Sequence, residues 1–232
     1  MALHHGERYM TLYASDRGLS HFLRLAAVLA VATQLLAQGP PPGNQPPPPP
    51  PTAGINATID SDGSSATYIV TEQLVGINFP NDAEGTTPTV SGNLVIAPDG
   101  SIPVGSSKLT ADLRNLQSDQ DQRDGYIRNR VLETDKFPTA EFVPTKIEGL
   151  PKMIPFTGQA GVQITGNLTV HGVTKEATFQ GIATFNRNGT IAGRAKTTFN
   201  FATFGLNKPT IARLMSVDDK ITLELVYRLK RS

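Results

Sequence analysis

The sequence of 232 residues predicts an all-β fold, and two observations support that prediction. From about residue 66 onward, apolar and polar residues alternate in successive segments, as they do in strands whose side chains point to opposite faces of a sheet. Asn188-Gly189 lies between two such segments and is a strong signal for a two-residue hairpin. Many antiparallel strands with few helices form either a sandwich or a closed barrel, and alternation alone does not separate the two.

Eight strands are expected along the chain. The last shows the pattern most clearly, because Ile221, Leu223 and Leu225 alternate with Thr222 and Glu224. The expected strands are 66–78, 89–97, 104–113, 139–148, 160–171, 174–186, 190–201 and 219–230. A barrel of about eight strands has room for one ligand, and its closure removes exposed sheet edges.

One or two short helices interrupt these strands. Residues 118–121 supply capping side chains for a helix that ends near Glu133, and Tyr126, Ile127 and Val131 form a weak apolar stripe on it. Pro209 opens a second candidate, in which Ile211, Leu214 and Met215 follow at helical spacing.

The N-terminal region, residues 1–37, is typical of a secretory signal. Arg24 precedes a mainly apolar run, residues 25–36, and small residues follow it. The run is shorter than the roughly 20 residues of a membrane-spanning helix. We therefore expect an extracytoplasmic protein, periplasmic or secreted. If the segment stays uncleaved as a signal anchor, the protein would instead be tethered close to the membrane.

Residues 38–60 are expected to be a proline-rich disordered linker, and residues 61–232 the β-barrel domain. Six consecutive prolines end at Pro51, and proline lacks the amide donor that helices and sheets need. This stretch is expected to be a stiff polyproline II spacer. A proline-rich ligand for another domain is the alternative.

Charge and composition exclude several functions. The chain has 21 basic and 20 acidic residues; three and two of these lie in residues 1–37, which leaves 18 of each. A neutral domain is not expected to bind nucleic acid, which requires a basic excess. Cysteine is absent, and His171 is the one histidine after residue 37, so neither a metal site nor a cofactor is expected. With no Gly-x-Ser-x-Gly motif either, we expect no enzyme.

Three segments occur in an order that resembles a known family. The first is residues 92–97, Gly-Asn-Leu-Val-Ile-Ala, and the second combines Arg123-Asp124 with residues 136–142, Lys-Phe-Pro-Thr-Ala-Glu-Phe. The third is residues 166–174, Gly-Asn-Leu-Thr-Val-His-Gly-Val-Thr. Together they resemble the YceI-like family. Tyr126 departs from its pattern, because the family often has a histidine there.

The resemblance implies a closed antiparallel lipocalin-like β-barrel that holds a long isoprenoid lipid, of polyprenyl phosphate or quinone type, without catalysis. The oligomeric state stays open. A structural or adhesive envelope domain with a filled barrel is the alternative function. A barrel packed by its own side chains would favour that alternative.

Apolar residues on the strands are candidates to contact the lipid tail, although each could equally be ordinary core. The candidates are Phe142, Ile164, Leu168, Phe179, Phe185, Phe199, Leu223 and Leu225. Small residues on the same stripes either leave lumen volume or mark sharp bends of the barrel. They are Gly166, Gly181, Ala183, Gly193 and Ala195.

Three basic residues are candidates for the lipid head group: Arg123, Arg128 and His171. Arginine suits phosphate because its planar fork makes two parallel hydrogen bonds. The alternative for Arg123 is a salt bridge or cap at the helix start. The alternative for His171 is a surface or turn position.

Overall fold

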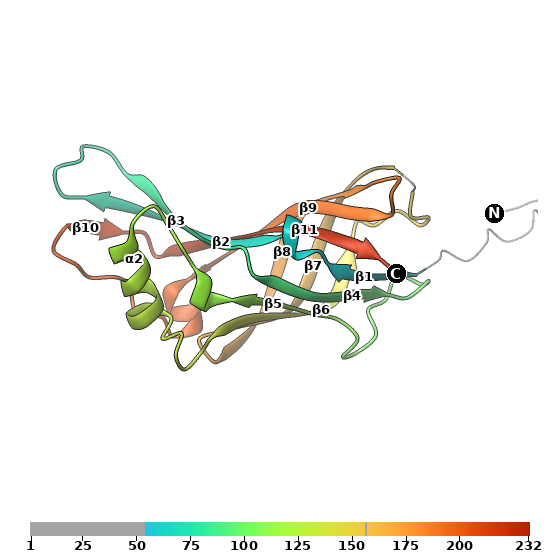
Figure 1. The fold of residues 1–232 in the computed structure, drawn as a ribbon, viewed down its shortest axis with the longest axis horizontal. Helices are drawn as coiled ribbons and strands as arrows, with labels where there is room; N and C mark the ends of the chain where they lie inside the picture. Colours follow the sequence, from blue (N-terminus) through green and yellow to red (C-terminus); the bar gives the residue numbers. More distant parts are fainter. Residues whose placement is uncertain (1–53, 156) are drawn as a thin grey trace, which may run out of the picture. The chain divides into compact units, whose positions relative to one another are not determined.

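The computed structural model describes residues 54–155 and 157–232, which form an antiparallel β-barrel with one short helix at one end (Figure 1). The predicted leader and most of the predicted linker lie outside these residues. The end of the linker is described, and it corrects the boundary predicted at residue 61. Ile55–Ile59 form strand β1, in which Ile55 and Ala57 are buried, so the barrel begins at least six residues earlier.

Three of the eight strand positions in the barrel wall are each built from two segments. Strands β1 and β2 (Ser65–Leu74) both pair with β11 (Lys220–Arg231), and the 3-10 turn η1 (Ser61–Gly63) separates them. Strands β3 (Asn81–Thr87) and β4 (Val90–Ile96) pair with β2 and β1. Strand β10 (Leu214–Val217) precedes β11 and pairs with β2.

The other five positions are single strands, and all neighbours are antiparallel. They are β5 (Lys108–Asp112), β6 (Thr139–Glu148), β7 (Gly158–Val170), β8 (Val173–Phe185) and β9 (Thr190–Asn200). The sheet runs from β4 through β9 to β11, and pairing of β1 with both β4 and β11 closes the ring. Closure confirms the predicted barrel and excludes the sandwich.

In the described part of the chain one short α-helix is present, at the end of the barrel where β2 and β3 join (Figure 1). Helix α2 (Asp121–Tyr126) continues into the π-helical turn η3 (Ile127–Val131). The second predicted helix is wrong, because Leu214–Val217 form β10, where Leu214 pairs with Leu74. Two further 3-10 turns are η2 (Leu113–Asn115) and η4 (Phe201–Phe204). Within the described residues, no helix has the length and apolarity needed to cross a membrane.

Strand β3 was not predicted, and its inward side chains explain why. Its buried positions are Ala83, Gly85 and Thr87, which give almost no apolar alternation. The ring of Tyr68, which pairs with Gly85, occupies the space that a side chain at Gly85 would need. The large aromatic ring of Tyr68 on β2 therefore fills the space that apolar side chains on β3 would otherwise occupy.

Strands β8 and β9 pair along only part of their length. Their pairing runs from Phe185 and Ile191 to Gln180 and Lys196, beyond which η4 contacts both strands. Phe204 of η4 is 1% exposed, and its ring meets Phe199 edge to face with 4.6 Å between ring centroids. A cleft of about 650 Å³ lies at this separation, and Phe199 lines it.

Candidate functional site

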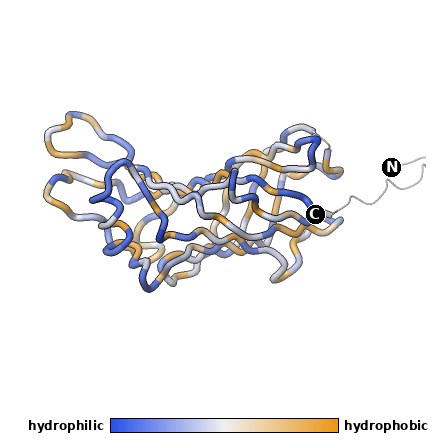
Figure 2. The backbone as a smooth tube through the Cα atoms, in the orientation of Figure 1, coloured by the Kyte–Doolittle hydropathy of each residue, from blue (hydrophilic) through white to orange (hydrophobic). Residues whose placement is uncertain are grey.

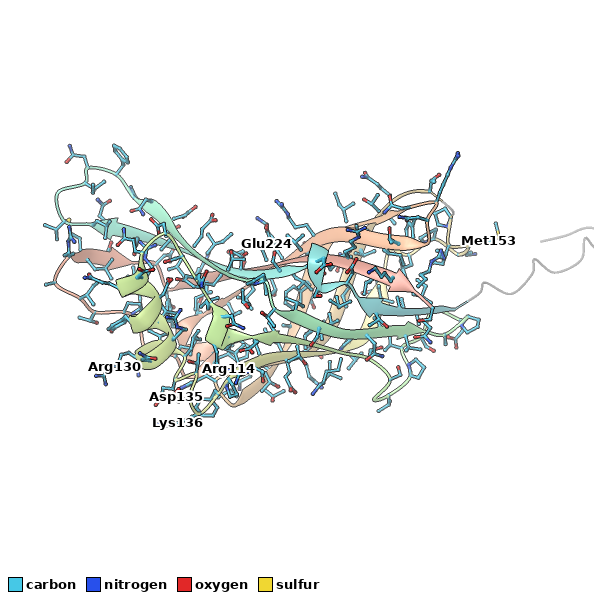
Figure 3. The ribbon with its side chains drawn as sticks, viewed as in Figure 1. Arg114, Arg130, Asp135, Lys136, Met153 and Glu224 are labelled. Carbon is cyan, nitrogen blue, oxygen red and sulfur yellow. The ribbon has the colours of Figure 1, made fainter. Side chains whose placement is uncertain are left out.

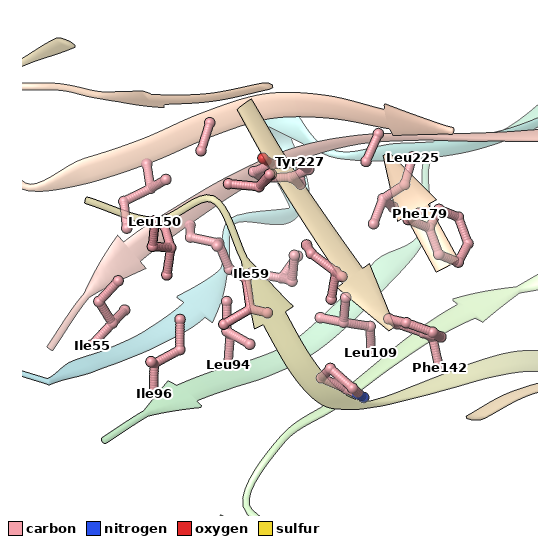
Figure 4. Close-up of a pocket in the computed structure, with 18 of the residues that line it drawn as sticks. Ile55, Ile59, Leu94, Ile96, Leu109, Phe142, Leu150, Phe179, Leu225 and Tyr227 are labelled. Atoms are coloured by element: carbon pink, nitrogen blue, oxygen red, sulfur yellow. The ribbon is translucent and has the colours of Figure 1, made fainter. Parts of the chain in front are cut away.

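The described part of the barrel contains two apolar cavities of very different size. A large cavity of about 570 Å³ is lined by residues of α2, η3 and the adjacent strand ends. A small cavity of about 50 Å³ lies among side chains of the other half (Figure 4). The small cavity has the volume of roughly a few water molecules, so this half is a packed core. The large cavity falls within the range of about 300–1,000 Å³ that is typical of small-ligand sites.

Individual strands line both cavities, each with a different part of its length. On β11, Ile221 and Leu223 line the large cavity, whereas Leu225, Tyr227 and Leu229 line the small one. On β6 the change falls between Ala140, which lines the large cavity, and Phe142, which lines the small one. The division of the lumen is thus set by side-chain size at successive inward positions.

Aromatic packing closes the small cavity near this division. Phe142 of β6 and Phe179 of β8 meet edge to face, with ring centroids 4.9 Å apart. Leu168, which pairs with Phe142 across β6 and β7, is buried in the same cluster. Such pairs stabilise a core beyond the burial of their area, so a hydrocarbon chain is not expected to pass this layer without repacking it.

Small side chains leave the volume of the large cavity. Ala66, Ala83, Ala111 and Ala140 line it from four strands, and Ala111 and Ala140 pair directly across β5 and β6. Large side chains at these positions would fill the space, because protein interiors leave few voids. The helical segment supplies an opposing wall through Tyr126, Ile127, Val131 and Leu132.

The polar part of the cavity wall includes Tyr68, Glu72 and Arg123, together with the exposed Arg213 and the uncharged Thr67, Thr87, Gln120 and Gln122. The guanidinium of Arg123 lies 3.1 Å from a carboxylate oxygen of Glu72 and 2.5 Å from one of Asp119. The Arg123 and Glu72 side chains are only 16% and 11% exposed. Burial raises the pKa of Tyr68 to about 12, against the opposing effect of Arg123, so this phenol stays neutral near pH 7. The carboxylates of Glu72 and Asp119 thus already compensate the charge of Arg123 within the protein.

The helix that carries Arg123 is held by a buried carboxylate. Asp124 is 6% exposed and accepts hydrogen bonds from the Ser118 backbone N–H at 2.8 Å and from its hydroxyl at 2.5 Å. This contact ties the chain before the helix to its first turn, and it places Arg123 toward the cavity.

The eight predicted tail residues are divided between the two halves. Phe199 and Leu223 line the large cavity, and Leu168 is buried core that lines neither cavity. The other five line the small cavity: Phe142, Ile164, Phe179, Phe185 and Leu225. All eight are inward or part of the core cluster, but the structure gathers only two of them around the large space.

The three predicted head-group residues do not meet. Arg123 lines the large cavity. Arg128 donates a hydrogen bond from Nη1 to the backbone oxygen of Leu116 at 2.5 Å and does not line that cavity. His171 lies in the turn between β7 and β8, where its Nε2 is 2.9 Å from a carboxylate oxygen of Glu133.

His171 and Gly172 explain the most recognisable segment of the sequence in structural terms. They form a two-residue turn in which φ is +51° at His171 and +73° at Gly172, as in the hairpin turn that requires positive φ at both central residues. The ring of Phe137 packs edge to face on His171, with centroids 4.6 Å apart. A side chain at position 172 would collide with that ring, 2.7 Å away. The segment thus joins the β7–β8 hairpin to the chain between η3 and β6.

The glycines expected to widen the lumen instead allow strands to approach closely. A β-carbon at Gly166 would meet the backbone of Val143 and Pro144, and one at Gly181 would meet the backbone of Arg194 and Ala195. One at Gly193 would meet the carbonyl oxygen of Ile182. Ala183 and Ala195 line only the small cavity. The three glycines therefore fit neither predicted alternative, lumen volume or sharp bends, because each permits the backbone of a neighbouring strand to approach closely.

Several residues of the large cavity were not among the predicted site residues. Tyr68 of β2, Leu113 and Leu206 line it together with the Tyr126, Ile127 and Val131 stripe. That stripe was visible as weak helical spacing, and it was the available signal for a wall at this end. For Leu113 and Leu206, in and beside short 3-10 turns, periodicity offers no signal.

Comparison with known proteins agrees with this architecture. The sequence model of the YceI-like domain matches residues 58–229. A UPF0312 protein of Pseudomonas putida (strain GB-1) is 32% identical over 208 residues, which cover 85% of this chain and 94% of that protein. A UPF0312 protein of Pseudomonas fluorescens (strain SBW25) is 37% identical over 129 residues, which cover 51% and 62%.

Two solved structures share the fold at low sequence identity. A polyisoprenoid binding domain from Saccharophagus degradans, implicated in plant cell wall breakdown, aligns with a TM-score of 0.59 and 15% identity, over 77% of this chain and 99% of that one. Burkholderia cenocepacia BcnA aligns with a TM-score of 0.54 and 17% identity, over 73% and 98%.

Proposed function

The chain belongs to the YceI-like domain family, and on that premise we propose that it is an exported protein that binds a long-chain isoprenoid lipid without catalysis. The observation that carries the proposal is the large cavity, an apolar space of about 570 Å³ between the helical segment and the alanine-lined strand ends. One of its structural neighbours is described as a polyisoprenoid binding domain, which supports the same ligand class. The alternative of a filled structural barrel fits only the half around the small cavity.

The ion pairs of Arg123 favour an uncharged head group, of quinone or prenol type, at that part of the cavity wall. Arg123 is neutralised by Glu72, whose side chain is 11% exposed, and by Asp119, whose side chain is 71% exposed, so a phosphate that took both positions on the guanidinium would displace the buried Glu72 carboxylate. Such displacement is costly, because it leaves a buried charge without its partner. A carbonyl or hydroxyl of a neutral head can instead share a hydrogen bond with Tyr68 or Arg123.

Energetics make the binding reversible when the lipid comes from a membrane. Burial of a CH₂ group from water is worth about 0.8 kcal/mol, so a chain of several isoprene units would be held very tightly against water. A bilayer is already apolar, and transfer from bilayer to cavity is close to balance. Length and head group then decide which lipid is held.

A cavity-filling variant tests the site. Ala140→Phe places a ring in the large cavity beside Ala111 and is expected to abolish uptake of geranylgeraniol, measured by equilibrium binding of the radiolabelled alcohol. Ala202→Phe is the matched control, because Ala202 is exposed on η4 and lines no described cavity. Its uptake is expected to equal that of the unmodified protein.

Two results would contradict parts of this proposal. Full uptake by a folded Ala140→Phe variant would show that the lipid binds elsewhere. Tighter binding of geranylgeranyl phosphate than of the alcohol would contradict the uncharged head group while leaving the tail site in place. Circular dichroism of each variant establishes that the barrel is intact.

Export rests on the sequence of residues 1–37 alone. We propose that the apolar run after Arg24 directs secretion and that the barrel acts outside the cytoplasm. N-terminal sequencing of the mature protein tests this. A mature N-terminus after residue 37 is expected, and a chain that retains this segment in the cytosolic fraction would contradict it.

A further inference from the structure

We infer that the mouth of the large cavity docks on an anionic lipid bilayer through an exposed apolar rim. The apolar rim is defined here as Val75, Ile77, Phe79, Ile211 and Met215. These residues come from the loop between β2 and β3, from the chain that leads into β10 and from β10 itself, which lie at the α2 end of the barrel (Figure 1).

Exposed hydrophobic side chains are concentrated at this one place. Among the described residues eight large hydrophobic side chains are exposed, and five of them form the apolar rim. Phe79 and Met215 are 69% and 65% exposed. Hydrophobic colouring marks both loops (Figure 2). Single exposed hydrophobic residues are ordinary, but a cluster marks a surface that contacts an apolar partner.

Backbone contacts hold the two loops together as one surface. The backbone N–H of Val75 donates to the carbonyl oxygen of Arg213 at 2.9 Å, and Leu214 pairs with Leu74 across β10 and β2. The side-chain amide of Gln73 donates to the carbonyl oxygen of Ile77, which fastens the turn of the first loop. The rim residues are therefore presented together.

The rim is continuous with the large cavity. Val75, Ile77 and Ile211 are exposed and also line that cavity. A lipid that enters the cavity from a docked position stays among apolar side chains throughout. A lipid that entered from water would lose about 0.8 kcal/mol for every CH₂ exposed on the way, which is a large barrier for a long chain.

The charges of the two loops match an anionic surface. Residues 73–81 carry no charged side chain, and residues 205–217 carry Lys208 and Arg213 with no carboxylate. Arg213 is exposed and forms no ion pair with any described residue, and the nearest carboxylate oxygen to Lys208 is that of Asp219, at 3.9 Å. Among the described residues Arg213 is thus unpaired and Lys208 is only loosely paired, and apolar side chains beside such cations are the combination that binds anionic lipid surfaces.

A single tryptophan provides the test, because the chain contains none. Phe79→Trp places the reporter on the apolar rim, and Phe79 itself does not line the large cavity. With vesicles of phosphatidylcholine and phosphatidylglycerol, its emission is expected to shift to the blue and to be quenched by brominated lipid. Met153→Trp is the matched control, since Met153 is 64% exposed at the other end of the barrel (Figure 3). Its emission is expected not to change.

Charge dependence is measured on the same reporter. Lys208→Glu in the Phe79→Trp background is expected to lower the apparent affinity for these vesicles by roughly five-fold or more, the effect of one basic residue beside an anionic surface. Vesicles of phosphatidylcholine alone are expected to bind more weakly than the anionic ones.

Three outcomes would overturn the inference. One is unchanged emission of Phe79→Trp with anionic vesicles, and another is an equal response of Met153→Trp. The third is a blue shift that appears without lipid as protein concentration rises, with a dimer in sedimentation, which would assign the rim to a second copy of the chain. The vesicles contain no isoprenoid, so a failure here is separate from a failure of geranylgeraniol uptake in solution.

Discussion

The phenol of Tyr227 lies over Gly193 in the filled half of the barrel. Its hydroxyl donates to the carbonyl oxygen of Ile182 at 3.0 Å, so one side chain of β11 spans β9 and reaches β8. A β-carbon at position 193 would come within 2.6 Å of that hydroxyl oxygen. The glycine is thus required by close packing between three strands.

Gly193→Val is expected to destabilise the barrel by about 1–3 kcal/mol, the usual cost of forcing extra atoms into a packed interior. Gly161→Val on β7 is the control, because a β-carbon there meets no atom within 4 Å. Urea unfolding of both variants measures the difference. Equal stability of the two would show that the Tyr227 ring and the backbone at Ile182 both move aside without cost.

Two buried tyrosines predict how stability depends on alkaline pH. Burial raises the pKa of both Tyr68 and Tyr227 to about 12, from an ordinary value of 10.0. Their neutral forms therefore contribute stability that is fully present below pH 10 and is lost as pH rises toward 12. The free energy of unfolding is expected to fall across this window.

Phenolate absorbance provides the direct check of these two residues. Tyr68→Phe and Tyr227→Phe are each expected to remove one group that titrates near 12 in the folded protein. If both variants instead lose a group that titrates near 10, the rings are open to solvent and the packing described for them is wrong.

At the scale of elements, helix α2 and turn η3 form the wall of the large cavity that has the lower local stability. The helix has six residues, too few to be stable alone, so it depends on its contacts with the barrel and on Asp124. Strands β5 and β6 across the cavity are instead held by ladder hydrogen bonds. Local opening is therefore expected to begin at the helical wall.

Removal of the Ser118 hydroxyl tests this dependence. Ser118→Ala leaves buried Asp124 without its 2.5 Å hydrogen bond, and a loss of about 1 kcal/mol is expected from comparable caps. Hydrogen exchange should accelerate at the amides of residues 121–131, with little change in β7 and β8. Ser91→Ala, at an exposed position of β4, serves as control. Unchanged exchange in the helical segment would contradict the role given to Asp124.

For the whole molecule, alternation in the sequence predicted most of the strands, and the resemblance to the YceI-like family predicted that they close into a barrel. Strands such as β7, β8 and β11 have one apolar and one polar face, and that alternation is what periodicity detects. Strand β3 was not predicted because its inward residues are small, and β1 was not predicted because residues 38–60 were interpreted as a proline-rich linker. A second helix was expected after Pro209 because Ile211, Leu214 and Met215 have helical spacing, but in so short a segment pairing with β2 outweighs that spacing.

The position of the cavity could be predicted less well than the fold. Alternation identifies which residues point inward, but it does not show how far along the barrel axis each one lies. Leu223 and Leu225 are neighbours on one stripe, yet they line different cavities. Arg123 was among the predicted residues, whereas its neutralisation by Glu72 depends on a contact between residues 51 positions apart.

The central claim is that the large cavity shelters a hydrocarbon chain, and photochemical labelling tests it most directly. A prenol that carries a diazirine at the far end of its chain is bound and illuminated, and the modified peptides are mapped by mass spectrometry. Adducts are expected on residues of β5, β6 and η3 that line the large cavity, such as Ala111, Ala140 and Ile127, and unlabelled prenol should compete. Labelling confined to the outer face, or to residues of the small cavity, would contradict the claim.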